Sequence, residues 1–287
     1  QESDFATWKG RLDIYGLDFR NVAALESFCA FVKTDYPRLD ILINNACQTI
    51  RYYSYASLHA YLINNHHHQS ISITSGSSSS SSSSFMSSQM PLTKDDVKCG
   101  PTQLPVGLKD VNNQQLDVRK CNSWLLKIDQ VETPEIAEVF VINAMAPFVL
   151  NSKLIPFMRK SGPGTRKFII NVSAMEGKFY RHKLPTHPHT NMAKAALNMM
   201  TRTCSSELAK ENILMNSVDT GWINDENPIE KALFLIFLCN FQTPIDEIDA
   251  AARILDPVFM CVDDIAAATS STPLFGLFFK DYHETEW

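Results

Sequence analysis

The sequence predicts an α/β protein built on a doubly wound parallel sheet, and three observations carry that prediction. A strand, helix, strand unit runs through Leu12–Leu17, a helical stretch that ends near Pro37, and the apolar segment Leu39–Ile43. Alternating strand and helix patterns return after residue 123. Polar residues follow the apolar strands, which is where ligands bind in such sheets. We therefore expect one main α/β domain.

Composition narrows the class of protein. The 287 residues carry a net charge of −5, which argues against binding to nucleic acid, because such binding rests on clustered Lys and Arg. The seven cysteines are widely spaced and include no C-x-x-C pair, so we expect reduced, mostly buried thiols in a cytoplasmic protein. No signal peptide is visible, and the apolar run 232–239 is too short to span a membrane, so we expect no membrane span. That run is typical of a buried or partner-facing helix.

The chain divides into three parts. Residues 1–50 form a partial dinucleotide-binding half, in which Leu39–Ile43 is expected to be buried on both faces. Residues 51–122 contain His66–His68 and the serine run 77–84, so we expect a disordered, low-complexity insertion without a metal site. Residues 123–287 complete the domain, with a lid over 222–244.

The elements expected in the last part alternate regularly. A long helix begins near Pro134 and is kinked or interrupted by Pro147. The strand Phe168–Val172, a helix over 191–211, the strand Ile213–Val218, a helix over 246–262 and a strand around Leu274–Phe279 follow.

Several polar residues are candidates for chemistry. Lys194 lies among alanines near the start of a helix, where its ammonium can hold hydroxyl groups or lower the pKa of a neighbour. Asn143 is polar on an apolar helical stripe, so it is either a buried structural amide or a catalytic residue that holds water. Asn44, Asn45 and Ser173 stand at strand ends.

The order of these motifs resembles the short-chain dehydrogenase/reductase family, which has a Rossmann-like fold, and more narrowly an atypical branch of it. The motifs are Asn44-Asn45-Ala46-Cys47, Asn143, Asn171-Val172-Ser173-Ala174, Thr190-Asn191-Met192-Ala193-Lys194 and Asp219-Thr220-Gly221. The resemblance implies NAD or NADP as cofactor and hydride transfer on a small carbonyl or alcohol substrate. It also implies a homo-oligomer paired through the helices at Pro134–Lys160 and Asn191–Glu211.

The resemblance also assigns roles to residues. Lys194 matches the lysine that binds the nicotinamide ribose, and Asn143 matches the asparagine that holds water. Asp18 matches an acidic residue near the adenine, while Asn44, Asn45, Thr220 and Gly221 match cofactor-binding positions.

Two relay positions depart from the family pattern. Thr190 stands in the place of the catalytic tyrosine, and an aliphatic hydroxyl is far harder to ionise than a phenol. The serine position falls on Ala174, with Ser173 one residue early. Tyr180, in the loop before the Lys194 helix, is the alternative proton donor, and water is another.

The front of the chain lacks a glycine-rich phosphate loop, so the sequence resembles a family member without its first strand-helix-strand portion. We expect unpaired strand edges in the sheet and weak or absent dinucleotide binding. Three interpretations stay open: an active oxidoreductase, a catalytically degenerate dinucleotide-sensing or scaffolding protein, and the product of a pseudogene or mis-started gene model.

Overall fold

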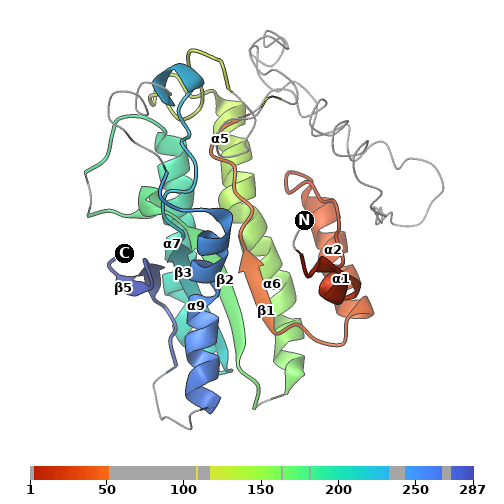
Figure 1. Cartoon of the computed structure of the whole chain (residues 1–287). Coiled ribbons are helices and arrows are strands. Elements are labelled where there is room, and N and C mark those ends of the chain that lie inside the picture. The colour runs from red at the N-terminus through yellow and green to blue at the C-terminus, as the bar shows by residue number, and fades with distance from the viewer. Residues whose placement is uncertain are drawn as a thin grey trace, which may run out of the picture.

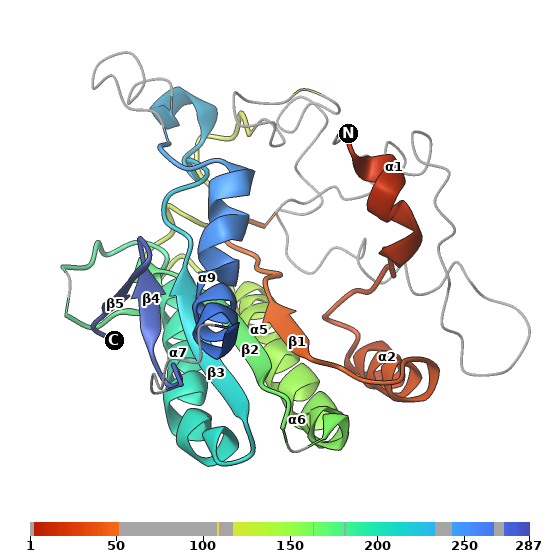
Figure 2. The same ribbon diagram turned by 60° about the horizontal axis from the view of Figure 1, so that its bottom comes forward.

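The computed structural model describes residues 3–51, 108, 117–162, 164–180, 182–232, 243–266 and 273–287. In this part of the chain, a five-stranded sheet has the order β1-β2-β3-β4-β5. Strands β1 to β4 are parallel, and β5 is antiparallel to β4. Helices cover the sheet on both sides: α6 and α7 pack on one face and α9 on the other (Figures 1 and 2). The predicted α/β class is confirmed.

The elements follow in chain order. The helices are α1 (Phe5–Trp8), α2 (Val22–Asp35), α5 (Thr133–Phe140), α6 (Ala146–Met158), α7 (Pro188–Ala209) and α9 (Glu247–Ala266), with a π-helical turn at Val141–Met145 and short 3-10 turns at Lys9–Arg11, Arg159–Ser161 and Met175–Gly177. The strands are β1 (Ile41–Asn44), β2 (Lys167–Ser173), β3 (Ile213–Asp219), β4 (Phe278–Lys280) and β5 (His283–Thr285).

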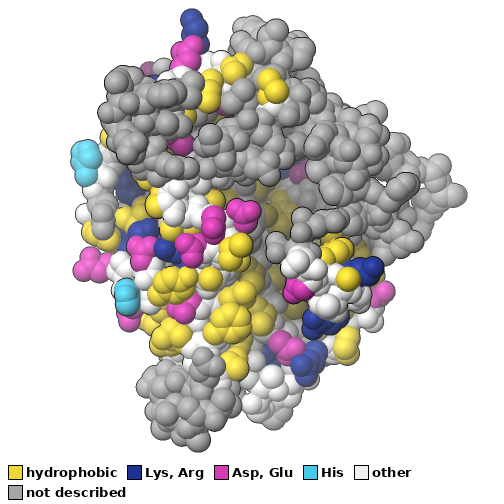
Figure 3. Space-filling view, in the orientation of Figure 1, with side chains coloured by type: hydrophobic (Ala, Val, Ile, Leu, Met, Phe, Trp, Pro, Cys, Tyr) yellow, Lys and Arg dark blue, Asp and Glu magenta, His cyan; other side chains and the backbone are white. Residues whose placement is uncertain are grey.

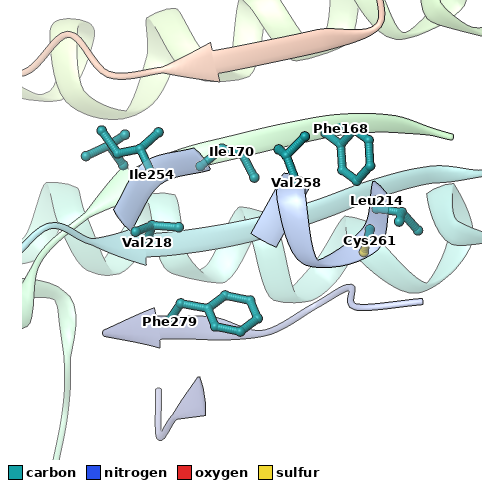
Figure 4. Close-up of a cluster of buried hydrophobic side chains, with 9 residues drawn as sticks. Phe168, Ile170, Leu214, Val218, Ile254, Val258, Cys261 and Phe279 are labelled. Atoms are coloured by element: carbon teal, nitrogen blue, oxygen red, sulfur yellow. The ribbon is translucent and has the colours of Figure 1, made fainter. Parts of the chain in front are cut away.

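The central strands are buried from end to end. Every residue of β2 and β3 is buried, including the polar ones, as expected for central strands of a parallel sheet that is covered on both faces. Alternate side chains of the two strands pack under α9, where Ile254 and Val258 close a core cluster with Ile170 (Figure 4). Burial of each such large side chain stabilises the fold by about 1.5–3 kcal/mol.

Strand β1 differs from its prediction. Ile41 is 40% exposed and Ile43 is 37% exposed, so burial of this strand on both faces was wrong. The reason is its place at the edge of the sheet, where β2 is its only strand partner among the described residues. Hydrophobic side chains are also exposed on α9, notably Ile248 and Phe259. Figure 3 shows hydrophobic side chains gathered on the surface where α9 lies.

The predicted strand Leu12–Leu17 is not part of the sheet. The segment is irregular, and Leu12 and Ile14 are about half exposed, whereas Leu17 packs against the cluster that joins α2 to α6. An apolar segment becomes a strand only when a neighbouring strand accepts its hydrogen bonds, and in the described residues none does. The strand prediction for this segment was therefore wrong.

The long helix is interrupted one turn before Pro147. Proline has no N–H, and its ring crowds the carbonyl group four residues earlier, which belongs to Asn143. The helix widens here into the π turn, in which the N–H of Ala146 donates to the carbonyl oxygen of Val141. The predicted interruption is confirmed, and it places Asn143 in the widened turn. Such π turns are frequent at functional sites.

The helical run Thr133–Ser161 is, by length and composition alone, apolar enough to cross a membrane. The core helix of a soluble protein passes the same test, and Leu154 and Met158 of this run are buried in the interior clusters. The run therefore serves as a packing helix of the α/β fold.

Some predictions lie outside the described residues, namely the low-complexity tract with His66–His68 and most of the lid's apolar run, 233–239. The five described cysteines are free, but Cys47 and Cys121 are exposed, so the prediction of mostly buried thiols holds only for Cys29 and Cys261.

Candidate functional site

Lys194 is buried beside the carboxyl end of β2. Its side chain is 5% exposed, and its Nζ donates a 2.9 Å hydrogen bond to the carbonyl oxygen of Val172. Helix α7 carries Lys194 in its second turn, and Pro188 in the first turn suits a helix start because its missing N–H would have no partner there. The lysine predicted from sequence is thus at the edge of the sheet where such folds bind ligands.

Two hydroxyl groups near this lysine lack hydrogen-bond partners. Thr190 lies one helical turn before Lys194 and is 2% exposed, and its Oγ1 has no partner. Ser173 follows Val172, is 4% exposed, and its Oγ is likewise unpaired. A buried hydroxyl without a partner costs about 1–3 kcal/mol, so these two groups mark a place that a polar ligand or water would satisfy.

Asn143 holds the loop that follows β1. Its Oδ1 accepts a 2.7 Å hydrogen bond from the backbone N–H of Gln48, and its Nδ2 donates a 2.8 Å bond to the carbonyl oxygen of the same residue. The side chain is therefore fully engaged with one backbone unit. This geometry favours the structural role that the sequence left open, while the π turn around Asn143 packs against α7.

Asn44 belongs to a polar ladder inside the sheet. Asn44, Asn171 and Ser217 lie level with one another on β1, β2 and β3. Asn44 donates to Asn171 at 2.7 Å, Asn171 donates to Thr201 of α7 at 2.8 Å, and Thr201 and Ser217 share a 2.8 Å bond. Asn151 of α6 accepts a second bond from Asn44. Asn45, by contrast, is exposed.

The end of β3 supplies the other cofactor-binding candidates. Gly221 has a φ of +89°, a conformation that favours glycine, and its N–H donates to Asp219 Oδ1 at 2.8 Å. A Cβ on Gly221 would lie 3.2 Å from Arg253 Nη1, so the backbone and this guanidinium are in close contact. Thr220 beside it is buried.

Asp18 and Tyr180 are engaged elsewhere. Asp18 binds Arg20 through both carboxylate oxygens, and Arg20 continues to Glu138 of α5 at 3.4 Å. The hydroxyl of Tyr180 accepts a 3.3 Å hydrogen bond from the buried Lys178, whose Nζ also donates to Thr285 of β5. The structure joins Lys194, Val172 and the two hydroxyls, and it places Tyr180 with Lys178 instead.

Sequence reasoning missed a group of buried charges next to this site. Glu135 and Glu138 are 3% and 4% exposed on α5, and Arg51, which follows the β1 loop, is 5% exposed. The only signal in the sequence was two carboxylates three residues apart on the inward side of an apolar helix, and that spacing is equally common on solvated surfaces. No group of His, Cys, Asp and Glu in the described residues has the arrangement of a metal site.

Glu135 and His189 form a buried pair between α5 and α7. His189 Nε2 lies 3.7 Å from Glu135 Oε1. Burial alone would raise the pKa of Glu135, but the His189 ring and the Ser123 hydroxyl, with Arg51 farther away, lower it below its usual range. A carboxyl group with a depressed folded pKa stabilises the fold above its unfolded pKa, and that contribution is lost as the pH falls through the folded value.

We therefore expect Glu135→Gln to reduce the acid sensitivity of the fold. The ionised carboxylate contributes its stabilisation above about pH 4.5, the ordinary value for this group, and the variant lacks it at every pH. Urea unfolding of both proteins from about pH 3 to about pH 7, a range that brackets the titration of carboxyl groups, measures the difference in their free energies of unfolding. A difference between the two proteins that is constant over the whole range would contradict the assignment.

Comparisons with known proteins agree with the fold. The model of the short chain dehydrogenase family matches residues 115–232. An uncharacterized protein of Acanthamoeba polyphaga mimivirus is 28% identical over 274 residues, which are 90% of this chain and 54% of that protein. The 2-dehydro-3-deoxy-D-gluconate 5-dehydrogenase of Formosa agariphila is 26% identical over 112 residues, 37% of this chain and 39% of that enzyme. The chain thus spans about half the length, or less, of these curated relatives.

A solved structure shows the same fold. The short-chain dehydrogenase from Streptomyces avermitilis superposes with a TM-score of 0.52 and 17% sequence identity, covering 96% of this chain and 73% of that one. The family match covers the segment that carries Asn143, Thr190, Lys194 and Gly221. With its mostly parallel sheet and a buried lysine at the carboxyl end of β2, the chain has the fold of a short-chain dehydrogenase, and its residues 115–232 match the model of that family.

Proposed function

We propose that this chain is an NAD(P)-dependent oxidoreductase that transfers hydride to or from a small carbonyl or alcohol substrate. The observation that carries the proposal is at the carboxyl end of β2, where the buried Lys194 lies with the unpartnered hydroxyls of Thr190 and Ser173. A cation and two hydrogen-bonding groups in a water-poor setting suit a ligand rich in hydroxyls, such as a ribose.

The residues around the site fit a dinucleotide in part. Lys194 would leave the Val172 carbonyl to hold ribose hydroxyls, and the backbone of Thr220 and Gly221 would border the nicotinamide. Asn45 and Asp18 would lie toward the rest of the dinucleotide, with Asn44 fixing the sheet below. When bound, the nicotinamide supplies or accepts the hydride.

The source of the proton differs from the family pattern in the proposed reaction. During reduction the substrate oxygen gains a proton, and Thr190, Tyr180 and water are the three donors in this proposal. The Lys194 ammonium would stabilise negative charge that develops on that oxygen. The 222–244 segment is proposed as the substrate lid.

Lys194→Met tests the proposal directly. Methionine retains much of the aliphatic stem but removes the charge, so we expect NAD(P)H binding to weaken at least about tenfold and any turnover to vanish, since charge-assisted bonds contribute about 1.5–3 kcal/mol. Fluorescence titration with NADH and NADPH measures the binding. Lys210→Met, at an exposed position near the end of α7, is the control. Equal affinities in all three proteins would rule out the proposed site.

A second candidate function is dinucleotide sensing or scaffolding without turnover. The observation in its favour is Thr190 in the tyrosine position, because its hydroxyl does not ionise near neutral pH. Titration with NAD(P)H, followed by a screen of aldehydes, ketones and alcohols for changes in cofactor absorbance, separates the two functions. Binding with no turnover supports the sensor, and turnover supports the oxidoreductase.

The setting of this function is also a proposal. We infer a cytoplasmic homo-oligomer paired through α5–α6 and α7, because Phe148 on α6 and Met199 on α7 are each 57% exposed. Exposed large apolar side chains on adjacent helices are typical of subunit contacts. Light scattering on the purified chain measures the mass, and a monomer at every concentration would contradict the pairing.

A further inference from the structure

Three segments of the chain meet at one buried carboxylate. Glu138, on the inward side of α5, accepts a 2.8 Å hydrogen bond at Oε1 from the side chain of Gln48. Its Oε2 lies 3.3 Å from Arg51 Nε and 3.4 Å from Arg20 Nη1. The Glu138 side chain is only 2% exposed, so these interactions act in a setting from which water is largely excluded.

The charges around Glu138 balance. Asp18, Arg20, Glu138 and Arg51 alternate in sign along a chain of contacts. Burial alone would lower the pKa of the Arg20 guanidinium, but its contacts with Asp18 and Glu138 raise it. Removing the central carboxylate would take one charged contact from each of the two arginines, and loss of a contact to a buried charge is costly.

The segments gathered by Glu138 are those that flank the proposed cofactor edge. Residues 18–20 carry Asp18, and residues 48–51 continue the loop that begins at Asn45. The backbone of Gln48 is also clamped by Asn143 at both its N–H and its carbonyl group. Since residues 12–17 have no strand partner among the described residues, the Arg20 contact is a polar link between the front of the chain and α5.

We propose that Glu138 is a positioning residue that fixes the spacing of the 18–20 and 48–51 loops along the nucleotide-binding edge. The role in cofactor affinity rests on the proposed function, whereas the structural coupling of the two loops does not. Glu138 acts through Arg20, Arg51 and Gln48, and it contacts neither substrate nor cofactor in this proposal.

Glu138→Gln tests the coupling, because glutamine keeps the volume and one oxygen but removes the charge. Amide hydrogen exchange resolved by residue should accelerate about tenfold or more at Arg20, Gln48 and Arg51, while amides in β2 and β3 keep their rates. Glu135→Gln is the matched control, since it removes an equally buried carboxylate from the same helix, and this one pairs with His189 and not with Gln48 or Arg20. It should leave the amides of Arg20 and Gln48 unchanged.

Arg20→Gln is the milder second variant, because Arg20 is the most exposed of the partners at 18%. It should accelerate hydrogen exchange at the Arg20 amide alone, since Glu138 still contacts Gln48 and Arg51. Unchanged exchange at Gln48 and Arg51 in Glu138→Gln, or equal acceleration throughout the sheet, would overturn the coupling.

The effect of Glu138 on cofactor affinity is measured separately. If the wild-type chain binds NADH or NADPH, Glu138→Gln should raise the Kd about tenfold or more, and an unchanged Kd would overturn the positioning role in binding. If the wild-type chain binds neither, the proposed function fails, and the exchange rates still decide whether Glu138 couples the loops.

Discussion

Replacing Thr190 with tyrosine is expected to raise the proposed cofactor-dependent carbonyl reduction by about 10²–10⁴-fold, the usual contribution of a positioned general acid. Thr190 lies one helical turn before Lys194, and both side chains are buried at the carboxyl end of β2. A phenol at this position would have the Lys194 ammonium nearby, and a neighbouring positive charge lowers a phenol's pKa. The initial rate of NAD(P)H oxidation with a panel of small aldehydes and ketones measures the gain.

Thr190→Phe is the matched control for this gain. Thr190 is 2% exposed, so either aromatic ring must displace its neighbours, and the two variants share that cost. Only the tyrosine variant adds an ionisable hydroxyl. Equal rates in the two variants, with both folded by circular dichroism, would show that the missing phenol is not what limits this chain.

Gly177→Ala is expected to destabilise the fold by about 3 kcal/mol, the upper end of the usual cost of overpacking. A Cβ at this position would lie 2.8 Å from the carbonyl carbon of Lys194 and 2.7 Å from Asn198 Nδ2. Because part of this contact is with the α7 backbone, the helix or the loop after β2 must shift. Urea unfolding measures the loss, and cofactor affinity should fall with it because Lys194 moves.

Gly10→Ala is the comparison for this variant. A Cβ there would meet nothing within 4 Å, so we expect a change within about 0.5 kcal/mol, as for ordinary surface substitutions. A similarly small loss in Gly177→Ala would mean that the loop after β2 adapts freely and does not hold Lys194 in place.

The part of the fold that could be predicted from sequence is the part in which local pattern and burial agree. The strands around Ile170 and Leu214 are rich in apolar residues, as expected where both faces of a strand are covered, and the helix between them has the apolar spacing of a packed helix. Leu12–Leu17 has a similar apolar pattern without a partner, and pairing is a property of the neighbours that a single segment does not encode.

The turn between the last two strands could not be predicted from the sequence either. Strand β5 pairs with β4 through a turn at Asp281 and Tyr282, which both have positive φ. Hairpin turns of this kind favour Asn and Gly, and tyrosine gives no such signal. The last strand could therefore be predicted near Phe279, whereas the returning strand could not.

Some residues of the candidate site could be predicted from the sequence, and others could not. Lys194, Thr190 and Ser173 were predictable because motif order places them at strand and helix ends. The Glu138 group was not, because Arg20, Gln48 and Arg51 come together only when segments far apart in sequence have folded. Buried charge pairs depend on tertiary contacts, and residue spacing carries little information about them.

The polar ladder of Asn44, Asn171 and Ser217 has a consequence for the specificity of folding. If β1 slipped by one residue along β2, Asn44 would turn away from α6, and its amide would lose the partners it has on Asn151 and Asn171. A misaligned pairing thus leaves amide groups without hydrogen-bond partners, a cost that purely apolar strands would not have. The ladder therefore favours one register of the three parallel strands over other registers that would bury a similar apolar surface.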